Sequence, residues 1–588
     1  MKKLASYCLL SLLAIPAFSQ YYLRGEIKDE KNHPLSNARI FVHSIRAFYF
    51  SGATSGSFGI NERVLYDSLT ITMEGYETIT LKVRTDQWQT IILKATAEAI
   101  SKSQPKLISL TQDFNKSTNR KWFAGDETYF QLVENDFVRA DTFPNTGFSL
   151  NVNKASYSNV RRFLNMNSIV PPDAIRTEEL INYFNLNYRK PLNDSLFSVE
   201  SQLTSCPWNQ QKQLLFLNVS AKKLDLEKVP PGNFVFLIDV SGSMDMPNRL
   251  PLLKAAFQMF VKNLRAVDTV SIVTYGGFVQ IWLSPTSGSD KDKILKSIEE
   301  LDAEGDTPGE SGIKVAYQVA RNTFIKGGNN RVILATDGDF NVGETSEKAL
   351  DDLISNQRQS GVYLTCLGVG MGNFKDSKLQ TLAKKGNGNY AYLDDIHEAE
   401  RVLVKELTQT FYAVADDAYM NVSFNSEMVK SYRLIGFDNK KEALADSTNN
   451  LEGGEIGSGS SVLAIFEIEP TEKNSSNKNA VDGIDIASME LKYSLNQDSI
   501  NKKILYNARP VFVPMDNLNQ ELKFATTVTI FALKLKQSKF YTDQSWGYIK
   551  NFANNAADKN NYLQKEFLNL IDKATKLYGG RRKKRNSE

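Results

Sequence analysis

The sequence predicts a multidomain protein whose centre is an α/β domain with a doubly wound, Rossmann-like parallel sheet. Between residues 233 and 412, near-continuous apolar runs such as NFVFLID and NRVILAT alternate with amphipathic stretches such as LPLLKAAFQMFVKNL. Apolar strands separated by helices are typical of a parallel sheet that is covered on both faces. The length agrees with several domains, because 588 residues are too many for one hydrophobic core.

One strand of this central domain is expected to run against the others. VQIWLS follows TVSIVTY after only Gly276, Gly277 and Phe278. A parallel pair needs a crossover of about a dozen residues or more, so we predict that VQIWLS is an antiparallel strand at the edge of the sheet. Parallel strands are expected at NFVFLID, TVSIVTY, NRVILAT, VYLTCLG and NYAYLDD.

β-type runs lie on both sides of the central domain, for example KQLLFLNVSAKK before it and SVLAIFEIEP after it. The two ends of a compact domain often lie close together, so runs from both sides can join the same sheets. We therefore predict one discontinuous β-sandwich formed by residues 195–230 together with residues 413–515.

Helical periodicity marks two further regions. Residues 134–192 have apolar positions at helical spacing on either side of Pro171 and Pro172, and predict a small helical region. Runs such as LKFATTVTIFALKLK and LQKEFLNLIDKATKLY predict a helical C-terminal region over residues 516–580. Residues 581–588 form a basic tail, which we expect to be a frayed terminus. Attraction of this tail to anionic lipid or polysaccharide is the alternative.

Residues 1–19 have the pattern of a secretory signal peptide. A basic start is followed by an apolar run from Leu9 to Ala17, with small residues at Ala17 and Ser19 before Gln20. This run is too short for a permanent anchor, and no later stretch is long and apolar enough to span a bilayer. We expect an exported protein with no transmembrane span in the mature chain, located in the periplasm or associated with the outer membrane.

Residues 20–96 contain short alternating runs broken by turn residues, which predict a small β-sandwich. The segments GEIKDE, HPLSNARI, SGSFGI and GYET resemble the carboxypeptidase regulatory-like domain. That resemblance implies a structural or adhesive role, with His33 and His43 as turn and strand residues. The polar residues 97–133, which show little periodicity, are expected to be a linker.

Charge and residue usage exclude several classes of protein. Without Lys2 and Lys3 the chain has 68 basic against 67 acidic residues, whereas nucleic-acid-binding proteins normally have a basic excess. The three histidines are scattered, which argues against a His-rich zinc site and a Ser-His-Asp triad. Cys206 and Cys366 remain after removal of the signal peptide, and we expect both to be unpaired, buried thiols.

Oxygen-bearing side chains lie on three loops that are expected to meet at the carboxyl edge of the predicted sheet. Asp239-Val-Ser241-Gly-Ser243-Met ends the first strand, Thr307 lies on a later loop, and Asp337 follows NRVILAT. Doubly wound folds place their ligands at this carboxyl edge. Five oxygen donors without sulfur or imidazole suit a hard cation, and we predict Mg²⁺, with Mn²⁺ or Ca²⁺ as alternatives.

DVSGSM, the loop threonine and TDG together resemble the metal-ion-dependent adhesion site of the von Willebrand factor A (VWFA) fold. The resemblance implies that Ser241, Ser243 and Thr307 coordinate the ion through hydroxyls, while Asp239 and Asp337 act directly or through water. In that family the open position accepts a carboxylate from a bound partner. Two carboxylates neutralise a divalent ion, so an incoming acid meets no excess negative charge, although a neighbour such as Asp245 or Asp339 would oppose it.

The resemblance extends over most of the chain from about residue 148. ASYSNVRRFL, PPDAIRTEELINYF, CPWN, RLPLLK and NNRVILATDGDFNVG, with GNGNYAYLDD and YRLIGF, resemble the bacterial YfbK-type von Willebrand A proteins. One departure is that Asn151 and Asn153 stand where an acidic pair is expected.

Other polar residues near these motifs have simpler interpretations. A lone D-x-S-x-S is also a helix N-cap pattern, and Asp306 and Asp339 are expected to be solvated loop acids. Asp394 and Asp395 after NYAYL are expected to cap a helix. The glycines of GVGMGN do not match a phosphate-binding loop and are expected to form tight turns.

The leading hypothesis is a non-enzymatic, exported module for protein binding, adhesion or scaffolding, which captures an acidic group of a partner protein through the metal. The alternative is a metal-dependent hydrolase of unknown substrate, with Asp339 or Glu310 as the base. A third hypothesis is partnership with an ATPase, but the chain has no GxxxxGK[ST] motif of its own.

Overall fold

The computed structural model describes most of the chain after residue 20. The described residues are 21–30, 32–36, 38–52, 55–73, 76–94, 127–129, 134–193, 195–305, 309–338, 354, 361–372, 374–437, 454–475, 484–495, 498–542 and 544–585. The predicted signal peptide and nearly all of the predicted linker lie outside them. The chain divides into two compact units, Met1–Ile108 with Thr128–Gln131, and Ser109–Glu127 with Leu132–Glu588.

The first unit contains two small sheets that share one hydrophobic core. One sheet has the order β4-β1-β7 and the other the order β3-β2-β5-β6. Buried residues of both sheets, such as Ile27 on β1 and Ile71 on β5, belong to the same cluster. The strands are β1 (Tyr21–Asp29), β2 (Arg39–Val42), β3 (Ala47–Phe50), β4 (Ser57–Glu62), β5 (Tyr66–Thr72), β6 (Ile79–Arg84) and β7 (Trp88–Leu93). His33 follows β1 and His43 lies in the turn after β2.

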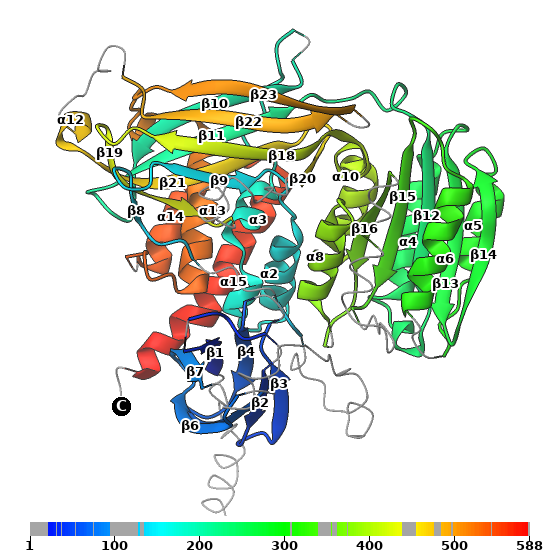
Figure 1. Cartoon of the computed structure of the whole chain (residues 1–588), viewed down its shortest axis with the longest axis horizontal. Helices are drawn as coiled ribbons and strands as arrows, with labels where there is room; N and C mark the ends of the chain where they lie inside the picture. Colours follow the sequence, from blue (N-terminus) through cyan, green and yellow to red (C-terminus); the bar gives the residue numbers. More distant parts are fainter. Residues whose placement is uncertain are drawn as a thin grey trace, which may run out of the picture. The chain divides into compact units, whose positions relative to one another are not determined.

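The second unit contains the central doubly wound sheet, with strand order β14-β13-β12-β15-β16-β17 (Figure 1). Five strands are parallel, and β14 pairs antiparallel with β13 at one edge. This confirms the antiparallel edge strand that the three-residue connection predicted. The strands are β12 (Gly232–Asp239), β13 (Thr269–Gly276), β14 (Phe278–Ser287), β15 (Asn329–Thr336), β16 (Val362–Gly368) and β17 (Tyr390–Tyr392).

Helices cover both faces of this sheet because its strands are apolar on both faces. On β12, Phe236 and Ile238 pack into one core and Val235 and Leu237 into the other. The first core includes α4 (Leu250–Lys262), α5 (Lys291–Glu299), α9 (Ile396–Glu400), the π-helical turn Arg401–Lys405 and α10 (Leu407–Phe411). The second includes α6 (Gly309–Asn322) and α8 (Asp376–Lys385). The helix expected at EKALDDLISNQRQ lies almost wholly outside the described residues.

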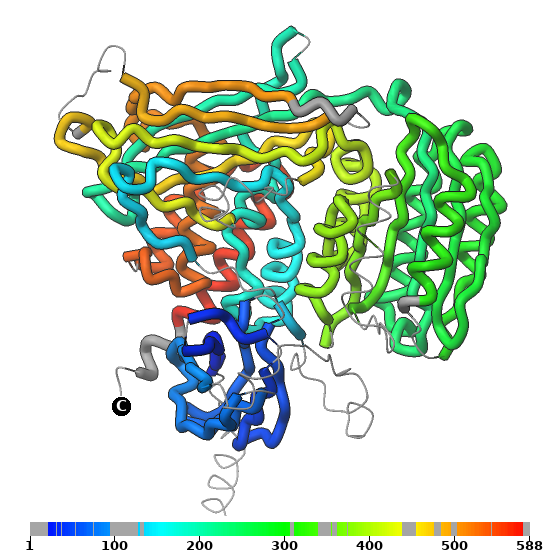
Figure 2. Tube along the Cα trace, viewed as in Figure 1, coloured from blue at the N-terminus to red at the C-terminus, as the bar shows by residue number. Residues whose placement is uncertain are grey.

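Strands from before and after the central domain share two five-stranded sheets. One has the order β10-β11-β21-β19-β8, where β8 is Val138–Arg139, and the other β20-β18-β22-β23, with β9 (Asn145–Ser149) also paired to β18. Figure 2 shows the cyan chain of β9 beside the yellow-green chain of β18, where Ser149 lies opposite Tyr419. Both sheets contribute to one core. Their strands are β10 (Phe197–Ser205), β11 (Gln213–Ala221), β18 (Ala413–Phe424), β19 (Val429–Ile435), β20 (Gly454–Gly457), β21 (Ser461–Pro470), β22 (Ala487–Leu495) and β23 (Asp498–Ala508).

The region predicted as helical, residues 134–192, differs from the prediction at its start. It opens with the short strands β8 (Val138–Arg139) and β9 (Asn145–Ser149), which extend the two flanking sheets. Helical structure begins only at α2 (Ala155–Asn165) and continues with a 3₁₀ turn (Pro172–Ala174) and α3 (Thr177–Asn182). The strands were missed because such short segments carry too little alternation to indicate a strand.

The C-terminal region is helical, with α13 (Gln520–Lys536), α14 (Trp546–Ala556) and α15 (Tyr562–Arg585). The helix α15 continues to Arg585, past the predicted end at residue 580. Helix propagation through Gly579 and Gly580 costs about 1 kcal/mol for each glycine and does not stop the helix. Phe524 on α13 and Phe567 on α15 pack edge to face with Phe184, which follows α3.

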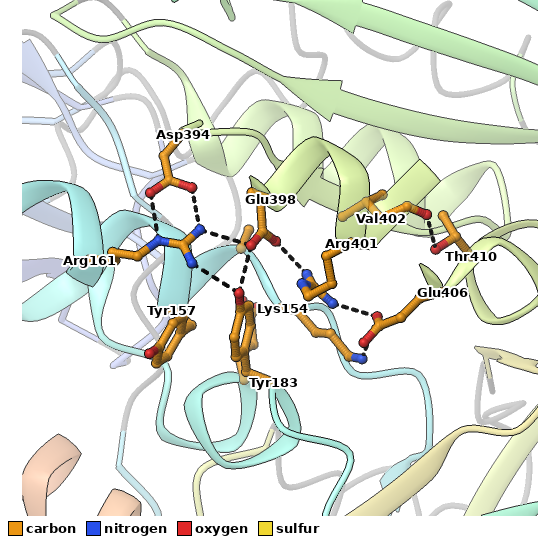
Figure 3. Close-up of polar contacts among 12 residues, drawn as sticks. Lys154, Tyr157, Arg161, Tyr183, Asp394, Glu398, Arg401, Val402, Glu406 and Thr410 are labelled. Carbon is orange, nitrogen blue, oxygen red and sulfur yellow. Dashed lines mark hydrogen bonds and ion pairs between the residues drawn. The ribbon is translucent and has the colours of Figure 1, made fainter. Parts of the chain in front are cut away.

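A largely buried network of charged side chains joins the helix α2 and the lysine before it to the end of the central domain (Figure 3). Arg161 donates two hydrogen bonds to Asp394 and one to Glu398. Arg401 bridges Glu398 and Glu406, and Lys154 donates to Glu406 at 2.9 Å. These contacts couple the helical region to the central domain.

Cys206 and Cys366 are buried and unpaired, which confirms the sequence-based prediction. Burial raises the pKa of both thiols above the ordinary value. Among the described residues, no helix is long and apolar enough to cross a membrane.

Candidate metal centre

The four predicted metal ligands that the structure describes lie at the point where the strand order of the central sheet reverses. The chain passes from β12 to β13 on one side of β12, and after β14 it crosses to β15 on the other side of β12. Asp239 is the last residue of β12, and Asp337 directly follows β15. Ligands of doubly wound folds bind at this position, and the fold therefore brings both carboxylates to the expected place.

Asp239 is completely buried and is held by three donors. Its Oδ1 accepts the backbone N–H of Ser241 at 3.0 Å. Its Oδ2 accepts hydrogen bonds from the hydroxyls of Thr336 at 2.9 Å and Tyr275 at 3.2 Å. Burial and then the charge of Asp337 raise the pKa of Asp239 to about 6. A nearby cation would offset both effects, because it favours the ionised carboxylate.

The two serines present their hydroxyls on a short turn. Ser241 precedes the 3₁₀ turn Gly242–Met244, and its Oγ lies 3.2 Å from the Oγ of Ser243. The hydroxyl of Ser243 donates to Asp337 Oδ2 at 2.8 Å. Neighbouring oxygens around an octahedral Mg²⁺ are about 3 Å apart, since Mg–O distances are about 2.1 Å. The hydroxyl spacing and the chemistry of the donors fit such an ion, and the exposed Ser243 is on the solvent side.

The fifth predicted ligand, Thr307, lies outside the described residues, as do Asp306 and Asp339. The segment before Thr307 is nevertheless tied to the serine turn. Gly242 N–H donates to Gly305 O at 3.0 Å, and Glu304 N–H donates to Val240 O at 2.6 Å. The structure therefore brings together Asp239, Ser241, Ser243 and Asp337.

Glycine is required where these segments meet. A Cβ atom at Gly276 would lie 2.7–2.8 Å from backbone atoms of Val240, Ser241 and Glu304. Any larger residue would push the serine turn and the segment before Thr307 away from β13.

Acidic side chains form only part of the predicted ligand set. Among the described residues, no group of three or more His, Cys, Asp or Glu side chains is placed to hold a metal. The predicted set has only two carboxylates, and the remaining donors are hydroxyls.

Arg249 is the charged residue of this site that sequence reasoning did not single out. Its Nη1 donates to Asp337 Oδ2 at 2.5 Å and to the backbone oxygen of Ser243 at 2.6 Å, and its Nη2 donates to Met371 O at 3.1 Å. The available signal was its position in RLPLLK, directly before α4 at the same edge of the sheet. A single arginine before a helix is usually solvated, so the pattern alone did not reveal this contact.

The neighbouring motifs mostly have the structural roles that were expected. Asp395 caps α9 by accepting the backbone N–H of Glu398, which confirms the cap. Asp394 is not a cap; it pairs with Arg161. Gly370 and Gly372 have φ values of 79° and 94°, as expected for tight turns. Asn153 accepts the backbone N–H of Tyr390 at 3.0 Å, so it has a structural contact at this position.

Comparisons with known protein families match three parts of the chain. The family described as von Willebrand factor matches residues 124–216, and the von Willebrand factor type A domain matches residues 233–410. The family described as uncharacterized protein YfbK, C-terminal, matches residues 409–577. A solved structure, von Willebrand factor type A from Catenulispora acidiphila, is 13% identical with a TM-score of 0.39. It covers 63% of this chain and 88% of that one.

Relatives among curated proteins agree with these matches. Protein sll0103 of Synechocystis is 27% identical over an aligned part that makes up 35% of this chain and 47% of that relative. The uncharacterized protein YfbK of Escherichia coli K12 is 36% identical over 471 residues, which are 76% of this chain and 81% of that relative. The chain therefore belongs to the YfbK-type family of proteins with a von Willebrand factor type A domain.

Proposed function

We propose that this chain is an exported, non-enzymatic protein-binding module that captures an acidic group of a partner through a divalent cation. The observation that carries the proposal is the convergence of Asp239, Ser241, Ser243 and Asp337 at the switch point of the sheet. Proteins with a von Willebrand factor type A domain typically mediate protein interactions, and family membership supports the same role.

The donor set favours a hard cation. The hydroxyls of Ser241 and Ser243 would bind the ion directly, and Asp239 and Asp337 would bind it directly or through water. Thr307, two residues after Gly305, is proposed as the third hydroxyl ligand. Five oxygen ligands suit the small octahedral Mg²⁺ better than Ca²⁺, which takes six to eight, and Mn²⁺ accepts the same ligands as Mg²⁺.

The proposed partner group is a carboxylate, either an acidic side chain or a chain terminus. A carboxylate oxygen is a favourable sixth ligand for a hard cation. Ser243 is exposed, whereas Asp239 is completely buried. This difference in burial between the two residues supports approach of the partner from the side of Ser243.

Export is proposed from the signal-peptide pattern of residues 1–19. We propose the periplasm or the surface of the outer membrane as the location. There the module would serve adhesion or scaffolding.

Isothermal titration of the purified chain with MgCl₂ tests the metal site. We expect one binding event that Asp239→Ala abolishes. Asp292→Ala removes an exposed carboxylate from α5 of the same domain and is the matched control, with affinity unchanged. Unchanged Mg²⁺ affinity in Asp239→Ala, with the fold verified by circular dichroism, would exclude this site.

Crosslinking in envelope fractions tests partner capture. The native chain should recover a protein that is absent in the presence of chelator and absent with Asp239→Ala. Recovery of the same proteins under all three conditions would contradict capture through a metal.

A further inference from the structure

Arg249 is fixed beside the proposed metal centre by contacts that do not depend on a metal. Two of its three hydrogen-bond acceptors are backbone carbonyl oxygens, those of Ser243 and Met371. The third is Asp337 Oδ2. Its side chain is 10% exposed, so the guanidinium is largely withdrawn from solvent.

The surrounding backbone leaves the arginine little freedom to move away. A Cβ atom at Gly370 would lie 2.6 Å from Arg249 Nε and 3.0 Å from its Cγ. The side chain therefore packs directly against a glycine whose lack of a side chain makes room for it. This packing and both carbonyl contacts do not involve the side chains proposed to bind the ion, so we expect them to hold Arg249 in place when the site is loaded.

A fixed guanidinium changes the charge of the centre. Counting only the described side chains Asp239, Asp337 and Arg249, the two carboxylates carry two negative charges and Arg249 reduces their net charge to minus one. A divalent cation then brings the loaded centre to plus one, whereas the two carboxylates alone would give a neutral loaded centre. Interactions at such short range are strong, because the groups are only partly solvated.

We propose that Arg249 is a built-in counter-charge that lowers the affinity of the centre for divalent cations and makes the loaded centre selective for an anionic carboxylate ligand. This inference rests on the proposed metal-dependent capture and names how the same site chooses its ligand. A carboxylate bound to the loaded centre brings its net charge to zero. Reversible loading follows from the weakened attraction for the cation.

The charge role differs from a purely structural role in a measurable way. If Arg249 only positioned Asp337, its removal would weaken Mg²⁺ binding. If Arg249 acts as a counter-charge, its removal would strengthen Mg²⁺ binding. Lysine keeps the charge but has a different shape, while glutamine keeps hydrogen-bonding capacity without the charge.

The test is titration of the full chain with MgCl₂ at about 0.15 M ionic strength, where remote surface charges are screened. We expect Arg249→Gln and Arg249→Met to bind Mg²⁺ on the order of tenfold more tightly than the native chain. Arg249→Lys should stay within about threefold of the native affinity. Affinity that is equal or weaker in both neutral variants overturns the proposal, and Arg249→Gln alone decides if Arg249→Met does not fold.

A second measurement uses poly-L-glutamate as the carboxylate probe at saturating Mg²⁺. The native chain and Arg249→Lys should bind it in a chelator-sensitive manner, and Arg249→Gln should bind it at least severalfold more weakly. Equal binding by Arg249→Gln overturns the selectivity. Absence of Mg²⁺ binding by the native chain would instead refute the proposed function itself, so the two failures are distinguishable.

Discussion

Arg161 of α2 and Glu398 of α9 form a buried ion pair, with Arg161 Nη2 2.8 Å from Glu398 Oε2. Both side chains are at most 3% exposed. Glu398 also accepts hydrogen bonds from Arg401 and from the hydroxyl of Tyr183 (Figure 3). The pair is therefore the centre of the network that couples the helical region to the central domain.

Replacement of Glu398 by glutamine should destabilise the larger unit by about 3 kcal/mol. The substitution leaves Arg161 and Arg401 buried with one fewer counter-charge, and breaking a buried ion pair costs about 3–5 kcal/mol. The lower figure is expected because both arginines keep other carboxylate partners. Urea unfolding followed by circular dichroism measures the change. Glu427→Gln breaks the exposed pair with Lys473 and should leave the midpoint unchanged.

The contribution of Glu398 should disappear in acid. Burial alone raises its pKa, but the charges of Arg401 and Arg161 outweigh burial and lower the pKa to about 2. The ordinary value is 4.5, so the unfolded chain takes up the proton first as the pH falls. The stabilisation is complete above pH 4.5 and is lost toward pH 2. The urea midpoints of the native chain and Glu398→Gln should differ by a constant amount above pH 4.5 and approach each other as the pH falls from 4.5 toward 2; a difference that stays constant over this lower range would contradict this assignment.

The central sheet could be predicted from the sequence because its signals are local. Each parallel strand is a continuous apolar run, and the short connection before β14 determines its direction. The strands β8 and β9 could not be predicted, since they are short and pair with β19 and β18, which lie far along the chain. Their stability comes from partners that no local pattern reveals.

The metal centre shows the same division between local and distant information. The spacing of Asp239, Ser241 and Ser243 is a local property of one turn, and the position of Asp337 follows from its strand. Arg249 was missed because its partner, Asp337, is brought to it only by folding. The interpretation of Asp394 as a cap failed for the same reason, since Arg161 lies on a separate helix.

Thr336→Val should weaken Mg²⁺ binding although Thr336 is not a proposed ligand. Its hydroxyl donates to Asp239 Oδ2 and accepts the backbone N–H of Gly338. Valine has nearly the same shape but leaves both groups with one fewer partner, at a cost of about 1–3 kcal/mol. The looser Asp239 should reduce Mg²⁺ affinity severalfold in calorimetry.

Thr529→Val is the matched control for this prediction. Thr529 is buried on α13, and its hydroxyl donates to Ala525 O of the same helix. The variant should leave Mg²⁺ affinity unchanged. Equal affinities of Thr336→Val and Thr529→Val would show that Thr336 does not position Asp239.

Gly370 and Gly372 allow the position of Arg249 to be tested without changing Arg249 itself. Both glycines have positive φ values, so alanine costs about 1–2 kcal/mol of backbone strain at either position. At Gly370 the new Cβ would meet Arg249, whereas at Gly372 no atom of the described residues beyond its chain neighbours lies within 4 Å of the Cβ position. Gly370→Ala should therefore shift the guanidinium from Asp337 and destabilise the chain more than Gly372→Ala.

In titrations, Gly370→Ala should bind Mg²⁺ more tightly than the native chain, as is expected of Arg249→Gln, and Gly372→Ala should match the native chain. Identical Mg²⁺ affinities in the two alanine variants would mean that the packing at Gly370 does not hold Arg249 against Asp337.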